Sequence, residues 1–226
     1  MKPIAPILAL TALTAACSSP KPAAAPKAVV AAAVAQAPAD APAGVYVMDM
    51  THTSVNFRLS HLGLSHYTAR FTKADGQLTF DPAKPDAQSV SVTIDAGSLQ
   101  TNYPDAARLD FDSLIEKEFL GAAQFPTITF KSTRVALTGP KTATLTGDLT
   151  LHGVTRPVAL QATFNGGYKP NSFDPMGARV GFSAKGTFRR SDFGIAYGLP
   201  APGTTMGVGD EVEVAIETEF TSKPAP

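Results

Sequence analysis

Four histidines, at positions 52, 61, 66 and 152, are the first candidates for chemistry in this 226-residue chain. Two metal ligands on one strand need an i, i+2 spacing, because alternate side chains share a face. No pair of these histidines has that spacing, and only His61 continues the inward phase of its predicted strand, while His52 is out of phase unless a bulge intervenes. We therefore predict no metal site, and we expect His61 to lie at a rim, bound to a backbone carbonyl.

Arg190 and Asp192 are the second candidate. They stand two residues apart at a predicted strand end, so they share a face. Arg190 could hold a pyrophosphate or a quinone oxygen, or it could pair with Asp192 and close that end, which is the favoured interpretation. The chain has no Gly-x-Ser-x-Gly elbow, phosphate-binding glycine loop or dinucleotide fingerprint, so we predict that it is not an enzyme.

The N-terminal segment predicts export and lipidation. An apolar run follows Lys2 and is shorter than the roughly 20 residues of a membrane-spanning helix. Small residues then precede the sole cysteine, Cys17, which is similar to a bacterial lipobox; an ordinary secretory signal is the alternative. We predict a signal peptide over 1–16 and an Ala/Pro-rich tether over 17–43 that starts at an acylated cysteine. The serine that follows favours the outer over the inner membrane, with the protein facing the periplasm.

Period-two alternation of apolar and polar residues predicts eight strands and one domain over residues 44–222, followed by a tail over 223–226. Antiparallel strands with one polar face suit a sandwich or a barrel, and an even number with short connections favours an up-and-down barrel. The formal net charge is zero and no basic cluster is present, which argues against nucleic acid as a partner. The predicted strands cover about 45–60, 66–80, 88–95, 127–138, 142–152, 156–168, 178–190 and 210–221.

The most specific pattern is the segment 147–158, GDLTLHGVTRPV. Its alternation breaks at His152-Gly153, which predicts a hairpin with its turn there. The segment resembles the signature of the YceI-like family, lipocalin-like barrels that bind polyisoprenoid lipids. Three further segments match that family in order: 51–57 (THTSVNF), 125–130 (FPTITF) and 190–195 (RSDFGI).

The resemblance implies an all-β, eight-stranded antiparallel up-and-down lipocalin-like barrel with a hollow interior. Composition alone does not decide whether the interior is hollow or filled. Small inward residues such as Gly147 and Ala184 could either leave room for a slim ligand or complement large neighbours. The predicted ligand contacts share the inward phase: Phe57, Leu59, His61, Phe71, Val92, Phe130, Leu149, Leu160, Phe164, Phe182, Ala184, Phe188 and Arg190.

Two long connections, 96–126 and 191–209, are predicted to lie at one barrel end, because odd-numbered strands of an up-and-down barrel all finish at the same end. The first connection, between the third and fourth predicted strands, should contain a short helix capped by Asn102 or Tyr103, with Pro104 near its start. Its apolar stripe should pack on the barrel rim or act as a lid. Long loops on a rigid scaffold usually carry function, so we predict the ligand entrance at this end.

The resemblance implies a binding or carrier protein for a polyprenyl lipid or an isoprenoid quinone, with no other cofactor. Burial of apolar groups would drive binding, at roughly 0.8 kcal/mol per methylene. Two alternatives stay open: an enzyme that acts on such a lipid with His61 or Asp192 at the mouth, and a structural stress-response lipoprotein with a filled barrel. The predicted partners are the lipid and the membrane reached by the acyl anchor, and a homodimer is allowed.

Overall fold

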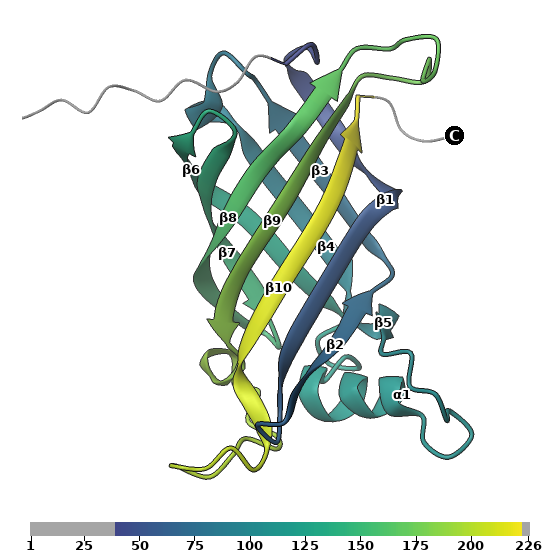
Figure 1. Ribbon diagram of the computed structural model, residues 1–226, viewed down its shortest axis with the longest axis vertical. Coiled ribbons are helices and arrows are strands. Elements are labelled where there is room, and N and C mark those ends of the chain that lie inside the picture. The colour runs from purple at the N-terminus through teal and green to yellow at the C-terminus, as the bar shows by residue number, and fades with distance from the viewer. Residues whose placement is uncertain (1–38, 223–226) are drawn as a thin grey trace, which may run out of the picture. The chain divides into compact units, whose positions relative to one another are not determined.

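Strands with one apolar face dominate the computed structural model, which describes residues 39–222 (Figure 1). The predicted signal peptide, Cys17, most of the tether and the tail over 223–226 lie outside the described residues. The strands are β1 (Gly44–His61), β2 (Ser65–Phe71), β3 (Ala74–Phe80), β4 (Ser89–Asp95), β5 (Leu99–Gln100), β6 (Thr127–Gly139), β7 (Thr142–Leu151), β8 (Val154–Tyr168), β9 (Arg179–Arg189) and β10 (Val208–Thr221).

Hydrogen bonding joins these strands into one closed antiparallel sheet. Its order is β10–β9–β8–β7–β6–β4–β3–β1–β2–β5, and β1 also pairs with β10. Both β2 and β3 pair with β1, along different parts of its length. They therefore count as one position in the barrel, which has eight strand positions in total. The predicted eight-stranded antiparallel barrel is confirmed, with two extra strands that the sequence pattern did not resolve.

The predicted strand over 66–80 is wrong in one respect, because the structure divides it into β2 and β3. The backbone amides of Thr72 and Lys73 leave the ladder and donate to the Ser98 carbonyl and hydroxyl oxygens, at 3.0 and 3.1 Å. Buried side chains on either side of the break, Phe71 and Ala74, stand three residues apart. An odd interval changes the face, so a break was needed to keep both residues inside.

The turn between β7 and β8 confirms the predicted hairpin. Leu151 pairs with Val154, and the two residues between them, His152 and Gly153, have φ values of 52° and 74°. Positive φ at both central positions defines the type I′ turn whose twist matches that of a hairpin. A side chain at Gly153 would also meet the Phe125 ring, since an added Cβ would lie 2.5 Å from it.

The helical segments are all short. Helix α1 (Phe111–Ile115) continues into a π-helical turn, η3 (Glu116–Leu120), and both lie between β5 and β6. The expected cap at Asn102 or Tyr103 is wrong: the Asp110 side chain accepts from the Ser113 amide at 3.1 Å, and residues 101–109 are irregular apart from a turn at 106–108. No helix within residues 39–222 has the length and apolar composition to span a bilayer. Three 3₁₀ turns complete the set: η1 (Pro85–Ala87), η2 (Ala96–Ser98) and η4 (Arg190–Phe193).

Two packed clusters lie towards the two ends of the barrel. One lies at the end that carries α1 and the 191–207 loop, which we call the helix end, and it includes Leu120 and Phe193. The other lies at the opposite end, called the turn end because the β6–β7 turn is there, and it is built around Phe80 and Phe164. Ala41, before β1, is 2% exposed and packs into this second cluster, so the buried part of the domain begins before residue 44.

Candidate functional site

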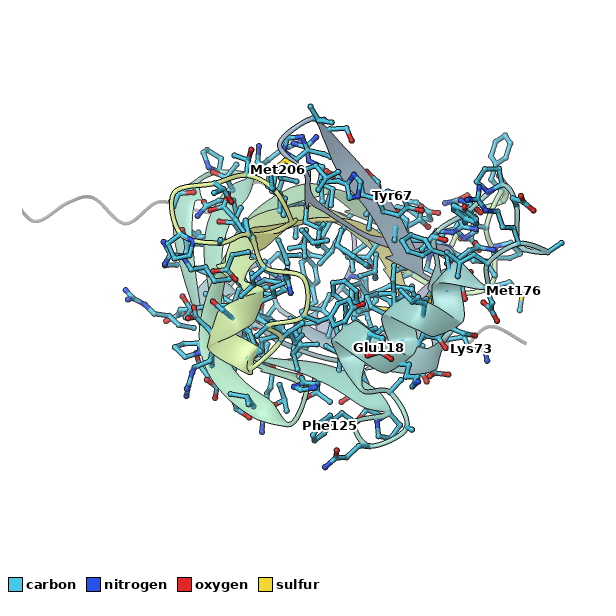
Figure 2. All side chains as sticks on the ribbon, turned by 90° about the horizontal axis from the view of Figure 1, so that it is seen from below. Tyr67, Lys73, Glu118, Phe125, Met176 and Met206 are labelled. Carbon is cyan, nitrogen blue, oxygen red and sulfur yellow. The ribbon has the colours of Figure 1, made fainter. Side chains whose placement is uncertain are left out.

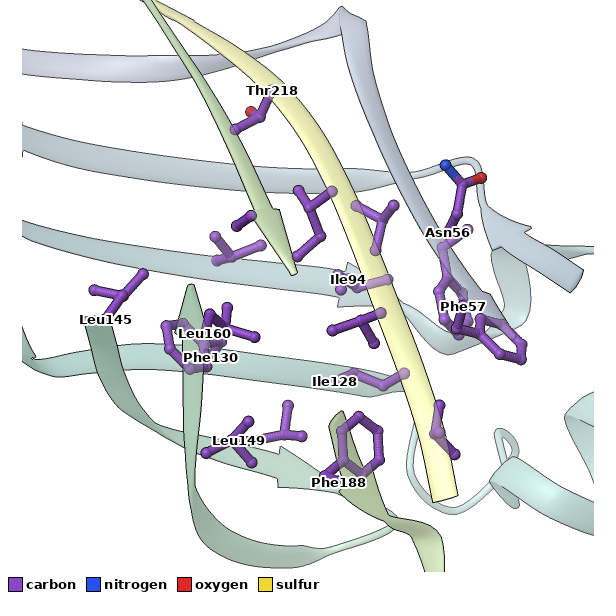
Figure 3. Close-up of a pocket in the computed structure, with 18 of the residues that line it drawn as sticks. Asn56, Phe57, Ile94, Ile128, Phe130, Leu145, Leu149, Leu160, Phe188 and Thr218 are labelled. Atoms are coloured by element: carbon purple, nitrogen blue, oxygen red, sulfur yellow. The ribbon is translucent and has the colours of Figure 1, made fainter. Parts of the chain in front are cut away.

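A cavity of about 500 Å³ lies inside the barrel (Figure 3). Inward-facing side chains such as Phe57, Phe130, Leu149 and Val214 are only half-buried, although they point away from the outer surface. The exposed part of these side chains faces the interior. The barrel is therefore hollow at this level, even though large side chains line its wall. The volume falls within the range of roughly 300–1,000 Å³ that is typical of small-molecule sites.

The structure brings all thirteen residues of the predicted ligand set to this cavity. They come from β1, β2, β4, β6, β7, β8 and β9, and from the first residue of η4, because each takes the inward phase of its strand. Their contact with a ligand stays a prediction. The residues are Phe57, Leu59, His61, Phe71, Val92, Phe130, Leu149, Leu160, Phe164, Phe182, Ala184, Phe188 and Arg190.

Sequence reasoning missed the aromatic lining residues of the connection before β6. Tyr103, Phe111 and Phe119 from the connection before β6 line the cavity at the helix end. The Phe111 ring packs at 5.5 Å from the Tyr67 ring and 5.4 Å from the Tyr103 ring. The apolar stripe of this segment was a usable signal, since its helical spacing placed Phe111 on an inward face.

At Gly147 the sequence left open either free space or a large neighbour, and the structure shows a large neighbour there and also at Gly186 on β9. A Cβ on Gly147 would lie 2.4 Å from the Phe130 ring, and one on Gly186 would lie 2.7 Å from a Leu160 methyl group. These glycines therefore complement large side chains on the adjacent strands. Ala184 and its cross-strand partner Ala162 do line the cavity, so free volume lies beside the alanines.

Arg190 is tied to the protein backbone, which contradicts the favoured pairing with Asp192, while its contact with an oxygen of a ligand stays a prediction. The residue is 2% exposed, and its guanidinium donates to the carbonyl oxygens of Gly209 (2.9 Å), Ile195 (3.0 Å), Tyr197 (2.8 Å) and Val208 (2.7 Å). Burial lowers the pKa of Arg190. The expected pair with Asp192 does not form, because the chain turns into η4 at this point and the guanidinium reaches across to the 195–209 segment.

The helix end is covered by segments that are distant in sequence. Figure 2 looks onto this end, where Tyr67, Glu118 and Met206 mark three different parts of the rim. The Phe119 ring lies 5.0 Å from the Tyr197 ring, and the Arg190 guanidinium carbon lies 5.5 Å from the Phe119 ring centre. Both long connections thus meet here, as strand parity predicted.

The histidines occupy separate places. His61 is exposed at the cavity rim, and among residues 39–222 no hydrogen-bond partner of its ring is found, so the expected carbonyl contact is wrong. His152 Nδ1 lies 3.2 Å from the Phe193 carbonyl oxygen, and His66 Nε2 lies 3.8 Å from Glu213. His52 is displaced by a bulge in β1 between Asp49 and Ser54.

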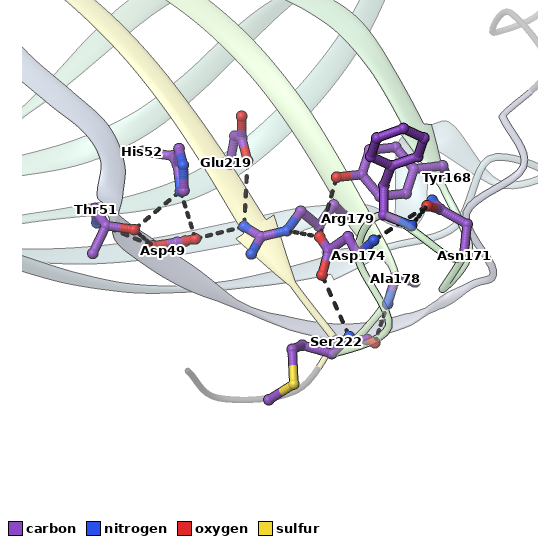
Figure 4. Close-up of polar contacts among 12 residues, drawn as sticks. Asp49, Thr51, His52, Tyr168, Asn171, Asp174, Ala178, Arg179, Glu219 and Ser222 are labelled. Carbon is purple, nitrogen blue, oxygen red and sulfur yellow. Dashed lines mark hydrogen bonds and ion pairs between the residues drawn. The ribbon is translucent and has the colours of Figure 1, made fainter. Parts of the chain in front are cut away.

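A polar cluster that includes His52 lies at the turn end (Figure 4). Asp49, His52 and Glu219 are close enough to share a cation. The Arg179 guanidinium already lies among these groups, since its Nη1 atom is 2.5 Å from Asp49 and 3.3 Å from Glu219, and its Nε atom donates to Asp174. Arginine thus supplies the positive charge that a metal would bring, which makes this an internal ion-pair cluster.

Hydrogen bonds set the ionisation of this cluster. Burial alone would raise the pKa of Asp49, but hydrogen bonds from Arg179, Thr51 and His52 outweigh it and hold that pKa well below its usual range. The hydrogen bond to Asp49 raises the pKa of Arg179. The pair is therefore fully charged at neutral pH and joins β1 to β9 across β10.

The charge of the cavity lining is one-sided. Within the described part of the chain, none of the residues that line the cavity is Asp or Glu. Two basic residues, Arg190 and Lys141, do line it. Asp192, which was considered as a catalytic partner, is exposed and does not line the cavity. The interior is therefore suited to an apolar molecule that is neutral or carries negative charge.

The sequence of this chain is similar to that of known proteins over most of the barrel. The sequence profile of the YceI-like domain matches residues 46–220. A UPF0312 protein of Pseudomonas savastanoi pv. phaseolicola is 44% identical over 156 residues, which cover 68% of this chain and 77% of that protein. A UPF0312 protein of Pseudomonas putida is 41% identical over 167 residues, which cover 74% of this chain and 80% of that protein.

Solved structures share the barrel. The crystal structure of Burkholderia cenocepacia BcnA has 26% sequence identity and a TM-score of 0.63, and covers 76% of this chain and 98% of BcnA. A Campylobacter jejuni YCEI protein has 25% identity, a TM-score of 0.59, and coverages of 73% and 90%. A domain from Saccharophagus degradans described as polyisoprenoid binding has 16% identity, a TM-score of 0.58, and coverages of 79% and 98%, and shows the likeness of fold alone.

Proposed function

Because the chain belongs to the YceI-like family, we propose that it binds a long apolar lipid, a polyprenyl lipid or an isoprenoid quinone, inside its barrel. It acts in this proposal as a binding or carrier protein rather than as an enzyme. The Saccharophagus degradans domain of similar fold, which is described as polyisoprenoid binding, makes a polyprenyl chain the first ligand to test.

The observation that carries this proposal is the apolar cavity. Its walls are mainly Val, Leu, Ile and Phe side chains, which lose no hydrogen bonds when a hydrocarbon chain displaces water. Each methylene-sized group that enters would contribute about 0.8 kcal/mol. The ordered wall requires little rearrangement, so most of this free energy remains available for affinity.

The proposed location follows from the N-terminal sequence. Acylation of Cys17 would hold the domain at a membrane facing the periplasm, the outer membrane more than the inner one. A tethered barrel of this kind could take up a lipid from the bilayer and release it elsewhere without any further cofactor.

Native mass spectrometry of the full chain, released gently from membranes, tests this proposal. We expect a bound species whose mass matches a polyprenyl lipid or an isoprenoid quinone, and its identity can be read from the extracted lipid. A protein that carries no lipid and takes up none when polyprenol or quinone is added would contradict the proposal.

A further inference from the structure

Two cations border the cavity, and they differ in what they can still bind. Arg190, at the helix end, is buried and donates to four backbone carbonyls. Lys141, at the turn end, is exposed and also lines the cavity. Ion pairing occupies several cations of the domain, including Arg58 and Arg179, but within residues 39–222 no ion pair or side-chain hydrogen bond of Lys141 is found.

The backbone holds Lys141 at the mouth of the cavity. Its carbonyl oxygen accepts from the Phe164 amide at 2.7 Å, and Phe164 is a buried member of the turn-end cluster. This bond fixes the β6–β7 turn against the barrel wall. The ammonium group is therefore on a flexible stem whose base is fixed beside the cavity.

The cavity reaches solvent beside this turn. Its lining includes the exposed residues Ser89, Pro140, Lys141 and Thr142. They belong to the start of β4 and to the β6–β7 turn, which are brought together because β6 pairs with both β4 and β7. At the helix end His61 is the exposed lining residue, whereas the lining residues Phe119 and Leu120 are half-buried or buried, so a chain threaded from the turn end would finish against Phe119 and Leu120.

We infer that Lys141 binds an anionic end group, a phosphate or a carboxylate, of a lipid whose apolar chain extends from the turn end towards the helix end. The inference rests on the proposed lipid-binding function and adds the orientation and the charge of the ligand. Because the described lining contains no carboxylate that could pair with Lys141, the lysine charge favours an anion and disfavours a cation at this mouth. It also moves the entrance from the helix end, where the sequence placed it, to the turn end.

The test compares two lipids with identical tails, geranylgeranyl phosphate and geranylgeraniol, by calorimetric titration of the lipid-free full chain. Lys141→Met keeps the length of the side chain but removes its charge. We expect it to weaken binding of the phosphate by about tenfold, the usual effect of losing a hydrogen bond to a charged group, and to leave the alcohol unaffected. Lys141→Arg should retain most of the affinity for the phosphate.

Lys185→Met is the matched control, because Lys185 is an exposed lysine on the outer face of β9 and pairs in register with the uncharged residues Ala215 and Gln161. It should bind both lipids as the unaltered chain does, and inorganic phosphate alone should bind to none of the proteins. Equal affinities of the Lys141→Met variant and the unaltered chain for the phosphate lipid would overturn the inference while leaving the lipid-binding function intact. Failure of the unaltered chain to bind either lipid would overturn both.

Discussion

The guanidinium carbon of Arg190 lies 5.5 Å from the centre of the Phe119 ring, and this contact joins the two long connections of the barrel. Phe119 belongs to the segment before β6, whereas Arg190 binds the carbonyls of the segment that leads into β10. A cation over an aromatic face adds an attraction of roughly 1 kcal/mol to the packing. The two connections are thereby joined at the helix end by a buried cation that makes no direct ion pair within residues 39–222.

Arg190→Lys should lower the free energy of unfolding by about 2–4 kcal/mol, because a lysine cannot satisfy four carbonyls in the planar arrangement of a guanidinium. Thermal melts and limited proteolysis of the 195–209 segment measure the effect. Arg189→Lys is the control, since Arg189 is the exposed neighbour on β9 and should melt as the unaltered chain does. An unchanged melting temperature for Arg190→Lys would show that the four backbone carbonyls do not need the planar guanidinium group as their hydrogen-bond donor.

Asp49→Asn should cost about 3 kcal/mol at neutral pH, because it leaves the Arg179 charge without its closest partner. The pKa of Asp49 is lower in the folded state than in the unfolded chain. Its contribution is therefore fully present above about pH 4, the unfolded value, and decreases progressively as the pH falls from there towards the lower pKa of the folded state. Urea unfolding at pH 7 and pH 3 measures both effects.

The Asp49→Asn variant should lose less stability than the unaltered chain between these two pH values, since the titrating carboxylate has been removed. Asp75→Asn is the control, because Asp75 is exposed on β3. A pH dependence that is identical in the unaltered chain and in Asp49→Asn would refute the assignment of this acid sensitivity to Asp49.

Gly147→Ala should destabilise the barrel by about 1–3 kcal/mol, the usual cost of overpacking. The added methyl group would meet the Phe130 ring and the Lys131 carbonyl oxygen, 2.4 and 2.7 Å from the ideal Cβ position. Gly181→Ala on β9 is the control, since the nearest atoms there are 3.8 Å away. Equal unfolding midpoints in urea for the two variants would mean that Phe130 moves aside freely.

Cys17→Ala should release the protein from membranes or leave it unprocessed, because the proposed acyl group is its anchor. Fractionation of cells and the intact mass of the mature protein give the readout. Cys17→Ala protein that stays in the membrane fraction with the mass of the unacylated chain would argue for a different means of attachment.

The fold was predictable because its signal is local and repeated. Each strand alternates apolar and polar residues, and the side-chain period of two fixes which residues point inward. This is why Phe57, Leu149 and Phe188, which are far apart in sequence, could all be assigned to one cavity. The β7–β8 turn was predictable for a similar reason, since His152-Gly153 interrupts two matching patterns.

The features that were missed depend on long-range contacts. The break after Phe71 exists because Ser98, 27 residues later, supplies the hydrogen bonds for Thr72 and Lys73. The role of Arg190 depends on where the loop before β10 folds back, which no spacing between Arg190 and Asp192 encodes. Lys141 was overlooked because turn lysines are usually solvated, and only the closed barrel shows that this one borders the cavity.

The occupancy of the cavity by lipid in an Ala184→Phe variant tests the central claim most directly. Ala184 lines the cavity beside Ala162, its partner on the adjacent strand β8, so a phenyl ring there would fill the space proposed for the lipid chain. Thr187→Phe adds the same ring at an exposed site on the outer face of β9 and is the control. By native mass spectrometry of the full chains, lipid should remain on the unaltered protein and on Thr187→Phe and be absent from a folded Ala184→Phe. The same lipid retained in the same amount by Ala184→Phe would contradict binding inside the barrel.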